Sequence, residues 1–259
     1  MSRNFELMRR MEELGVFSGL SMPAGAPAAP SDEPANGSNG TYGSNSNSRS
    51  NGNGRLGVRA RAEIARLVHT LFLSGSNAPH QVLFCSVDEG EASGRLCVAA
   101  GEVLAGEVPM PVCVVDAKVR APSLDRFFHS DGYATSRASG AGRLNARQVG
   151  SNLWFLSLDS TLSNGELART AEQLKASLRE VRKEFGYVLI DAEPVGQPAD
   201  AAALGSATDG VVLVLEANAT RRVAALSAKE ALEAAGVRLL GTVLNDRTFP
   251  IPEKLYRKL

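Results

Sequence analysis

Short apolar runs alternate with longer helical segments through residues 60–245, and this alternation limits what the chain can fold into. The run from Val211 to Leu215 is apolar at every position. A strand is apolar at every position when helices cover both faces of its sheet, which is typical of parallel sheets. The pattern therefore predicts an α/β fold with a doubly wound, mostly parallel sheet flanked by helices. Such a fold places its ligand crevice at the carboxyl ends of the strands.

Apolar periodicity and turn residues give the expected elements. The helix expected at 166–185 has the clearest pattern, because its apolar residues recur every three or four positions and Gly186 follows it. The other expected helices are 60–73, 94–105, 199–208, 221–235 and a short one from residue 252. The expected strands are 82–86, 111–116, 153–157, 187–191, 210–216 and 238–245.

Two segments precede this α/β domain, which is expected to span residues 57–259. Residues 1–17 are expected to form an amphipathic docking helix, which binds either its own domain or another protein. One side of this helix carries Phe5, Met8, Met11 and Leu14. Residues 18–56 are rich in Pro, Ala and Ser and then in Asn, Ser and Gly. They are too polar to offset the entropy of ordering and are expected to be a disordered low-complexity linker.

Overall composition excludes several classes of protein. The chain has 28 Lys and Arg residues against 28 Asp and Glu residues, and this balance argues against a nucleic-acid partner. No apolar run approaches the roughly 20 residues of a membrane span, and no N-terminal signal is expected. Cys85, Cys97 and Cys113 lack metal-ligand spacing, and the histidines are isolated. We therefore expect reduced core thiols and no zinc site.

The loop after the first expected strand has the position of a phosphate cradle but lacks its side chains. A phosphate loop needs glycines for close backbone approach, a Lys for the terminal phosphates and a hydroxyl for Mg²⁺. Of the pattern Ser-x-x-Pro-Gly-Glu-Gly-Lys-Ser/Thr-Thr, the chain retains Ser86, Gly90 and Glu91. At the second glycine, the lysine and the hydroxyl of that pattern stand Ala92, Ser93 and Gly94. The alternative is an ordinary strand-to-helix turn with one glycine.

Two aspartates end apolar strands. Asp116 follows the run at 112–115, and Asp191 follows the run at 187–190. In a parallel sheet both would face the same crevice as the loop after Ser86, where a magnesium ion and phosphates would bind. The alternative is that each aspartate caps a turn.

These segments resemble the cytoplasmic ATPase domains of bacterial tyrosine kinases, which are deviant Walker A P-loop ATPases that accompany polysaccharide chain-length determinants. The segment 116–124, Asp-Ala-Lys-Val-Arg-Ala-Pro-Ser-Leu, is similar to the family's second box, Asp-Ala-Asp-x-Arg-x-Pro-Ser-Leu. Lys118 stands at the second Asp of that box. The segment 185–195, Phe-Gly-Tyr-Val-Leu-Ile-Asp-Ala-Glu-Pro-Val, is similar to its Walker B segment. The resemblance covers about residues 60–247.

The resemblance implies roles for individual residues. Asp116 and Asp191 stand at catalytic and Mg²⁺-binding positions. The positions implied for ATP or ADP are Gly90, Glu91, Ser93, Gly94, Arg95 and Asn245. The positions implied for oligomerisation are Glu63, Arg66 and His69, in a segment that resembles Glu-x-x-Arg-x-x-Arg. It also implies a cytoplasmic protein held at the inner face of the membrane by a polysaccharide chain-length determinant, its partner, and a homo-oligomer.

The departures from the family pattern point to lost catalysis. The loop lacks the Lys that grips the β- and γ-phosphates, and Lys118 replaces a carboxylate with a cation. Arg95 or Lys118 could compensate only if its side chain reached the phosphates. We therefore expect a non-catalytic or weakly active tyrosine-kinase-like protein that regulates exopolysaccharide synthesis or export. The alternatives are an active ATP-dependent protein tyrosine kinase or ATPase of the same pathway, and a scaffold that binds no nucleotide.

Overall fold

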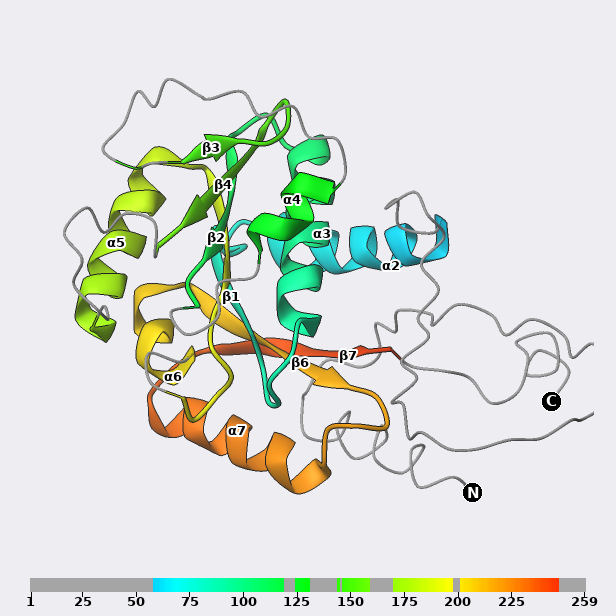
Figure 1. Cartoon of the computed structure of the whole chain (residues 1–259), viewed down its shortest axis with the longest axis vertical. Helices are drawn as coiled ribbons and strands as arrows, with labels where there is room; N and C mark the ends of the chain where they lie inside the picture. Colours follow the sequence, from blue (N-terminus) through cyan, green and yellow to red (C-terminus); the bar gives the residue numbers. More distant parts are fainter. Residues whose placement is uncertain are drawn as a thin grey trace, which may run out of the picture.

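Seven strands form one sheet in the order β3-β4-β2-β5-β1-β6-β7 (Figure 1). The structure, a computed structural model, describes residues 58–118, 124–130, 144, 146–158, 170–197 and 201–246. The strands are β1 (Gln81–Ser86), β2 (Val112–Asp116), β3 (Arg147–Gln148), β4 (Leu153–Ser157), β5 (Tyr187–Asp191), β6 (Gly210–Glu216) and β7 (Leu239–Asn245). β3 pairs antiparallel with β4, and every other neighbouring pair is parallel. The predicted fold class is confirmed.

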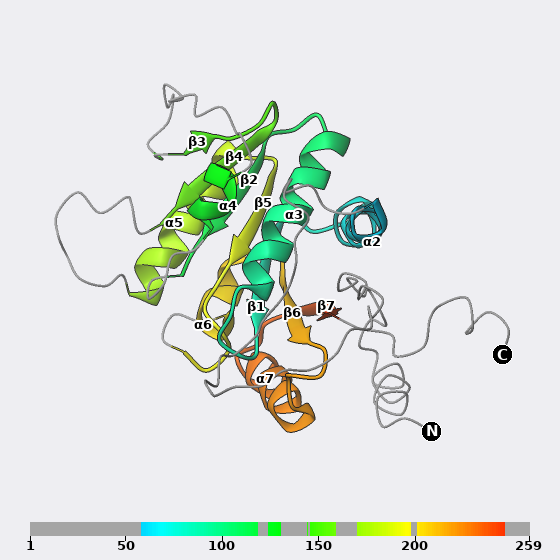
Figure 2. The ribbon, with the colours of Figure 1, turned by 45° about the vertical axis from the view of Figure 1, so that its right-hand side comes forward.

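Helices cover both faces of the sheet (Figure 2). One face packs against α2 (Val58–Val68) and α3 (Ala92–Glu107), and the other packs against α5 (Ala171–Glu184), α6 (Ala201–Leu204) and α7 (Arg222–Ala234). The remaining elements are the π-helix η1 (His69–Leu73), the short helix α4 (Asp125–Ser130) and the 3-10 turn η3 (Gly205–Ala207). Among the described residues, no helix is both long and apolar enough to cross a lipid bilayer.

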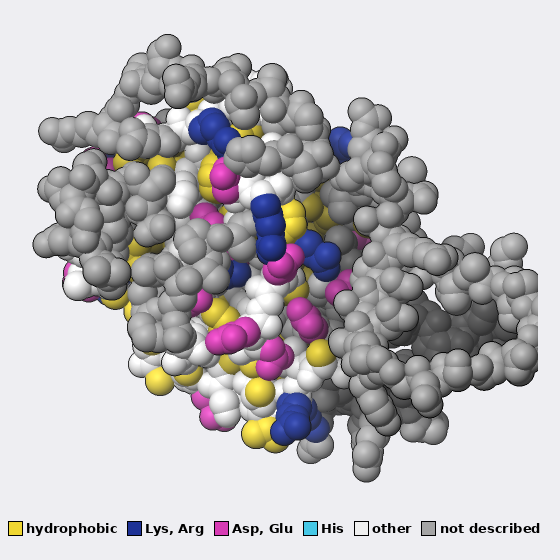
Figure 3. Space-filling model, in the orientation of Figure 1, with side chains coloured by type: hydrophobic (Ala, Val, Ile, Leu, Met, Phe, Trp, Pro, Cys, Tyr) yellow, Lys and Arg dark blue, Asp and Glu magenta, His cyan; other side chains and the backbone are white. Residues whose placement is uncertain are grey.

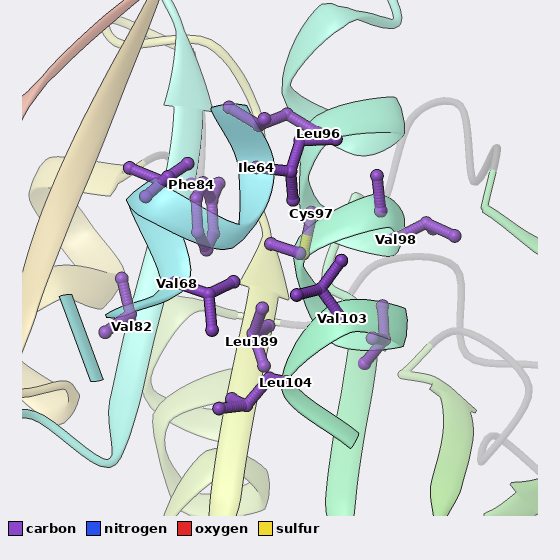
Figure 4. Close-up of a cluster of buried hydrophobic side chains, with 14 of the residues drawn as sticks. Ile64, Val68, Val82, Phe84, Leu96, Cys97, Val98, Val103, Leu104 and Leu189 are labelled. Carbon is purple, nitrogen blue, oxygen red and sulfur yellow. The ribbon is translucent and has the colours of Figure 1, made fainter. Parts of the chain in front are cut away.

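The two faces of each strand build two separate parts of the core, because side chains alternate along a strand. Phe84 of β1 and Leu189 of β5 lie on the face covered by α2 and α3, together with Ile64 and Leu96 (Figure 4). Leu83, the neighbour of Phe84, lies on the other face. The central strands β1, β2, β5 and β6 are buried on both sides, as their unbroken apolar runs predict, whereas the edge strands β3 and β7 are only partly buried.

The clearest expected helix begins later than its periodicity indicates. The expectation was residue 166, but Thr170 has an extended backbone, with ψ at 156°, and is the N-cap of α5. Its hydroxyl accepts a hydrogen bond from the Gln173 amide, and the Gln173 side chain accepts one from the Thr170 amide. This reciprocal capping box satisfies amides that have no partner inside the helix, so it fixes the helix start.

Other differences are local. The helix expected at 60–73 changes to π-helical spacing at His69, and the helix expected at 199–208 is split into α6 and η3. Sequence analysis did not predict α4 or β3, which are 6 and 2 residues long. The docking helix (1–17), the linker (18–56) and the C-terminal helix from residue 252 lie outside the described residues.

Candidate phosphate and magnesium site

The carboxyl ends of three adjacent strands meet where the sequence predicts a ligand crevice. β2, β5 and β1 are neighbours in the sheet and end at Asp116, Asp191 and Ser86. Asp116 and Asp191 are direct register partners. α3 begins at Ala92, after the short loop that follows β1. The parallel sheet therefore brings both predicted aspartates together beside the first turn of α3.

Asp191 is held by two side chains that differ from those of the family pattern. The Ser93 hydroxyl donates a hydrogen bond of 2.7 Å to Asp191 Oδ1. Lys118 Nζ lies 2.9 Å from Asp191 Oδ2. This second contact is an ion pair without hydrogen-bond alignment, since Oδ2 accepts no well-directed hydrogen bond. Lys118 is only 5% exposed, and its Nζ also donates to Ser93 Oγ at 3.4 Å. Ser93, Lys118 and Asp191 thus form one buried cluster.

Burial dominates the electrostatics of this cluster. Removal from water raises the pKa of Asp191 to about 6, while Lys118 and the Ser93 hydrogen bond oppose that rise and nearby Asp116 adds to it. A pKa of about 6 leaves the carboxyl mostly ionised at neutral pH. The ammonium of Lys118 is therefore the counter-charge of a buried carboxylate.

Asp116 has a structural task in the described crevice. Its Oδ1 accepts a hydrogen bond from the Lys118 amide at 3.2 Å, and its Oδ2 accepts one from the Leu124 amide at 2.9 Å. The two bonds hold both ends of the loop between β2 and α4. This is the turn-capping arrangement that sequence analysis kept as an alternative for this aspartate.

Gly94 brings α3 into direct contact with Asp191. A Cβ at this position would lie 2.8 Å from Asp191 Oδ2 and 2.7 Å from Leu124 Cδ2. Both distances are shorter than a Cβ tolerates, so a serine here would require a neighbour to shift. The glycine therefore fills the place of the magnesium-binding hydroxyl with a close packing contact.

The described residues do not fit the magnesium ion that the family resemblance implies. Mg²⁺ requires near-octahedral oxygen ligands and takes one or two carboxylates together with water and phosphate. Here the Asp191 carboxylate faces Lys118, and the Asp116 carboxylate accepts backbone amides. Within the part of the chain that the structure describes, no cluster of three or more His, Cys, Asp or Glu side chains is arranged to hold a metal ion.

The loop between β1 and α3 is acidic. The carboxylate of Glu91 pairs with Arg126 of α4. Asp88 accepts a hydrogen bond of 2.7 Å from the Thr220 hydroxyl. A Cβ added at Gly90 would lie 3.4 Å from Glu216 Oε1, so this carboxylate also approaches the loop. Acidic side chains gather near the middle of the face seen in Figure 3. Their charge opposes phosphate binding, whereas the backbone amides at the start of α3 favour it.

Arg95 pairs with a carboxylate that follows β7. Its guanidinium lies 3.8 Å from the Asp246 carboxylate, and both side chains are about half exposed. The pair links the first turn of α3 to the residue after β7. The prediction that Arg95 contributes to phosphate binding stays a prediction.

Asn245 lies at the same edge of the sheet. It is the last residue of β7, it is buried, and its register partner is Glu216 of β6. The Asn245 carbonyl accepts a hydrogen bond of 2.8 Å from the Ala217 amide. The position is compatible with a nucleotide base at the crevice, and its role in adenine binding stays a prediction.

The three residues implied for oligomerisation lie on or just after α2. Arg66 is 71% exposed on its side chain and lies 3.5 Å from Glu63. His69 is exposed and begins the π-helix, where the Ser74 hydroxyl donates to its carbonyl at 2.9 Å. The α-helical spacing that carries Glu63 and Arg66 therefore ends at His69, where the π-helix begins. The sequence pattern did not predict this change.

A separate hollow of about 190 Å³ lies beside the edge strand β7, far in the sheet order from β2. Its lining includes Leu67 of α2, Leu71 of η1, Pro79 before β1, and Leu240 of β7. These residues belong to none of the motifs that predict nucleotide chemistry. The crevice around Asp191 therefore remains the candidate site.

Two tyrosine-protein kinases are similar to the chain in sequence. The chain is 40% identical over 68 residues to the tyrosine-protein kinase CpsD of Streptococcus agalactiae, a match that covers 26% of this chain and 30% of that kinase. It is 28% identical over 185 residues to the tyrosine-protein kinase YwqD of Bacillus subtilis, which covers 68% of this chain and 76% of YwqD. No family model matches.

Solved structures show the same fold. The kinase domain of the Escherichia coli tyrosine kinase ETK aligns with a TM-score of 0.59 at 16% identity, covering 76% of this chain and 78% of that one. The chimerical protein CapA2B2 aligns with a TM-score of 0.59 at 18% identity, covering 74% and 87%. The chain has the fold of the bacterial tyrosine kinase ATPase domain. The CpsD match spans about 30% of that kinase's length, so activity and partners are matters for proposal.

Sequence analysis missed the use that the fold makes of Lys118. The motif comparison identified it as a substitution, with a side chain that could reach phosphates. The structure instead directs it toward Asp191, which is 73 residues away in the chain. The signal available in the sequence was the loss of two charges together, a lysine from the loop and a carboxylate from the second box.

Proposed function

We propose that this protein is a non-catalytic or weakly active relative of the bacterial tyrosine kinase ATPase domains. It would regulate exopolysaccharide synthesis or export through contact with a membrane chain-length determinant. The observation that carries the proposal is the buried ion pair between Lys118 and Asp191. In an active kinase the equivalent carboxylate faces a metal and phosphates, whereas here its charge is already neutralised.

Phosphoryl transfer depends on positive charge placed around the transferred group. Position 93 carries a hydroxyl that donates to Asp191, in place of a lysine that would face phosphates. The positive charge at position 118 is likewise directed at Asp191. What remains for a nucleotide is the backbone at the start of α3, which supports weak binding and gives little stabilisation of the transition state.

The partner and the pathway follow from the family resemblance. The sequence relatives are named tyrosine-protein kinases. The second box and Walker B segments resemble those of proteins that act with polysaccharide chain-length determinants, and this resemblance supports the proposed partner. We assign residues 1–17 to docking and 18–56 to a tether, because a tethered helix raises the effective concentration of a second contact with a bound partner. A cytoplasmic location at the inner face of the membrane follows from that contact.

The first test is turnover. We expect ATP hydrolysis and tyrosine autophosphorylation by the full chain to be far below the roughly 1 per second of active kinases. The measurement is phosphate release together with anti-phosphotyrosine detection, using purified wild-type protein and its Asp191→Ala variant. Turnover near 1 per second that disappears in Asp191→Ala would show an active kinase. A nucleotide titration of the same sample separates weak binding from the nucleotide-free scaffold.

A second test concerns self-association through α2. We expect Glu63→Arg to weaken oligomers, since it removes the pairing with Arg66 and places two like charges on one helical face. Exposed charges contribute little individually, so the association should be weak and sensitive to salt. Sedimentation velocity of concentrated samples measures it. If the wild type associates and Glu63→Arg associates equally well, another surface forms the oligomer.

A further inference from the structure

We infer that the Lys118 ammonium takes the place of the magnesium ion, so that the crevice is built around an internal cation and binds no metal. This inference rests on the proposed function in treating the crevice as the family's magnesium site. The test of this inference requires neither turnover nor a partner, so the inference and the proposed function can fail separately. It assigns Lys118 a positioning role: it holds Asp191 and Ser93 in place.

The Lys118–Asp191 pair differs from the other ion pairs that the structure describes. In every other described pair at least one side chain is substantially exposed, whereas here the two side chains are 6% and 0% exposed. Exposed pairs contribute little to stability because water solvates each charge almost as well. A buried pair is different, since removal of one partner leaves the other charge without either water or a counter-ion.

The surroundings of Lys118 match those of a bound cation. Its Nζ lies 2.9 Å from Asp191 Oδ2 and 3.4 Å from Ser93 Oγ, two oxygens that come from different elements of the fold. Its own amide donates to Asp116 Oδ1, which fixes the backbone from which the side chain extends. One residue therefore connects the end of β2, the end of β5 and the first turn of α3.

Exclusion of metal follows from charge and space. A divalent ion at Asp191 Oδ2 would lie next to the ammonium, and repulsion between cations at this distance is strong in a buried site. The ammonium would have to leave the crevice before an ion could enter. On the side of α3 there is little compensating room, because even a Cβ added at Gly94 would lie 2.8 Å from the same carboxylate oxygen.

The test is a double-mutant cycle on the full chain, read out as melting temperature. We expect Lys118→Met and Asp191→Asn each to lower the melting temperature by roughly 6 °C or more, since each leaves one buried charge unpaired. We expect the double variant Lys118→Met/Asp191→Asn to recover most of that loss, because a neutral pair of similar shape replaces the charged one. The matched control is Lys229→Met, whose pair with Glu233 is partly exposed and should change the melting temperature by roughly 2 °C at most.

Magnesium supplies the second readout. We expect the melting temperature of the wild type to be the same in MgCl₂ as in EDTA, and calorimetric titration with MgCl₂ to give no binding heat. A magnesium-dependent rise that Asp191→Asn abolishes would overturn the inference. The inference would also be overturned if the single variants melted no lower than Lys229→Met. It would be overturned equally if the double variant melted no higher than the less stable of the two single variants. If a single variant fails to fold, recovery in the double variant supports the inference, and a double variant that also fails to fold contradicts it.

Discussion

The double variant S93K/K118D, which places a lysine at position 93 and an aspartate at position 118, is expected to create magnesium-dependent nucleotide binding. The change lowers the net charge of the protein by one unit, since S93K adds a positive charge and K118D replaces a positive charge with a negative one. It restores the family arrangement of a lysine on the loop and a second aspartate in the second box. Each new hydrogen bond to a charged group contributes about 1.5–3 kcal/mol. We therefore expect the dissociation constant for ATP with Mg²⁺ to fall by roughly 10-fold or more. Isothermal titration with and without Mg²⁺ measures it.

Each single change is the control for the other. S93K alone adds a second ammonium beside Lys118, and K118D alone leaves Asp191 beside a further carboxylate, so neither should produce the gain. If S93K/K118D folds but binds ATP with Mg²⁺ no better than the wild type, the barrier is the packing of Gly94 on Asp191 and Leu124 rather than the charge arrangement. That result would favour the scaffold without nucleotide.

The strands were the most predictable part of the fold, and the ends of the helices were the least. β5 and β6 match their predicted bounds because an unbroken apolar run has few alternatives once both faces are covered. The predicted start of α5 was wrong because apolar periodicity continues before Thr170, whereas the capping box at Thr170 sets where the helix begins. β3 is too short for any periodicity, and it depends on pairing with β4.

The candidate site was predictable in position but not in its contacts. Strand order places Asp116 and Asp191 at one edge of a parallel sheet, and the sequence alone supports that inference. The direction of the Lys118 side chain depends on distances between β2, β5 and α3, which no local pattern encodes. The same is true of the Asp116 carboxylate, which accepts a hydrogen bond from the Leu124 amide eight residues later in the chain.

Replacing Gly101 by valine is expected to destabilise the domain by about 3 kcal/mol, because α3 packs on β2 through this glycine. A Cβ at Gly101 would lie 2.4 Å from Val114 Cγ2 and 3.6 Å from Leu153 Cδ1. Helix and strand would have to separate, and both carry residues of the candidate site. For a domain of this size the melting temperature should fall by roughly 6–12 °C, as measured by circular dichroism.

Gly106 provides a matched control in the same helix. It is exposed near the end of α3, and a Cβ there would meet no atom within 4 Å. Gly106→Val should therefore change the free energy of unfolding by no more than about 0.5 kcal/mol. Equal effects at both positions would mean that valine acts through helix propensity and not through the contact with Val114. A loss confined to Gly101→Val would instead show that the close approach of α3 to β2 at Gly101 stabilises the domain.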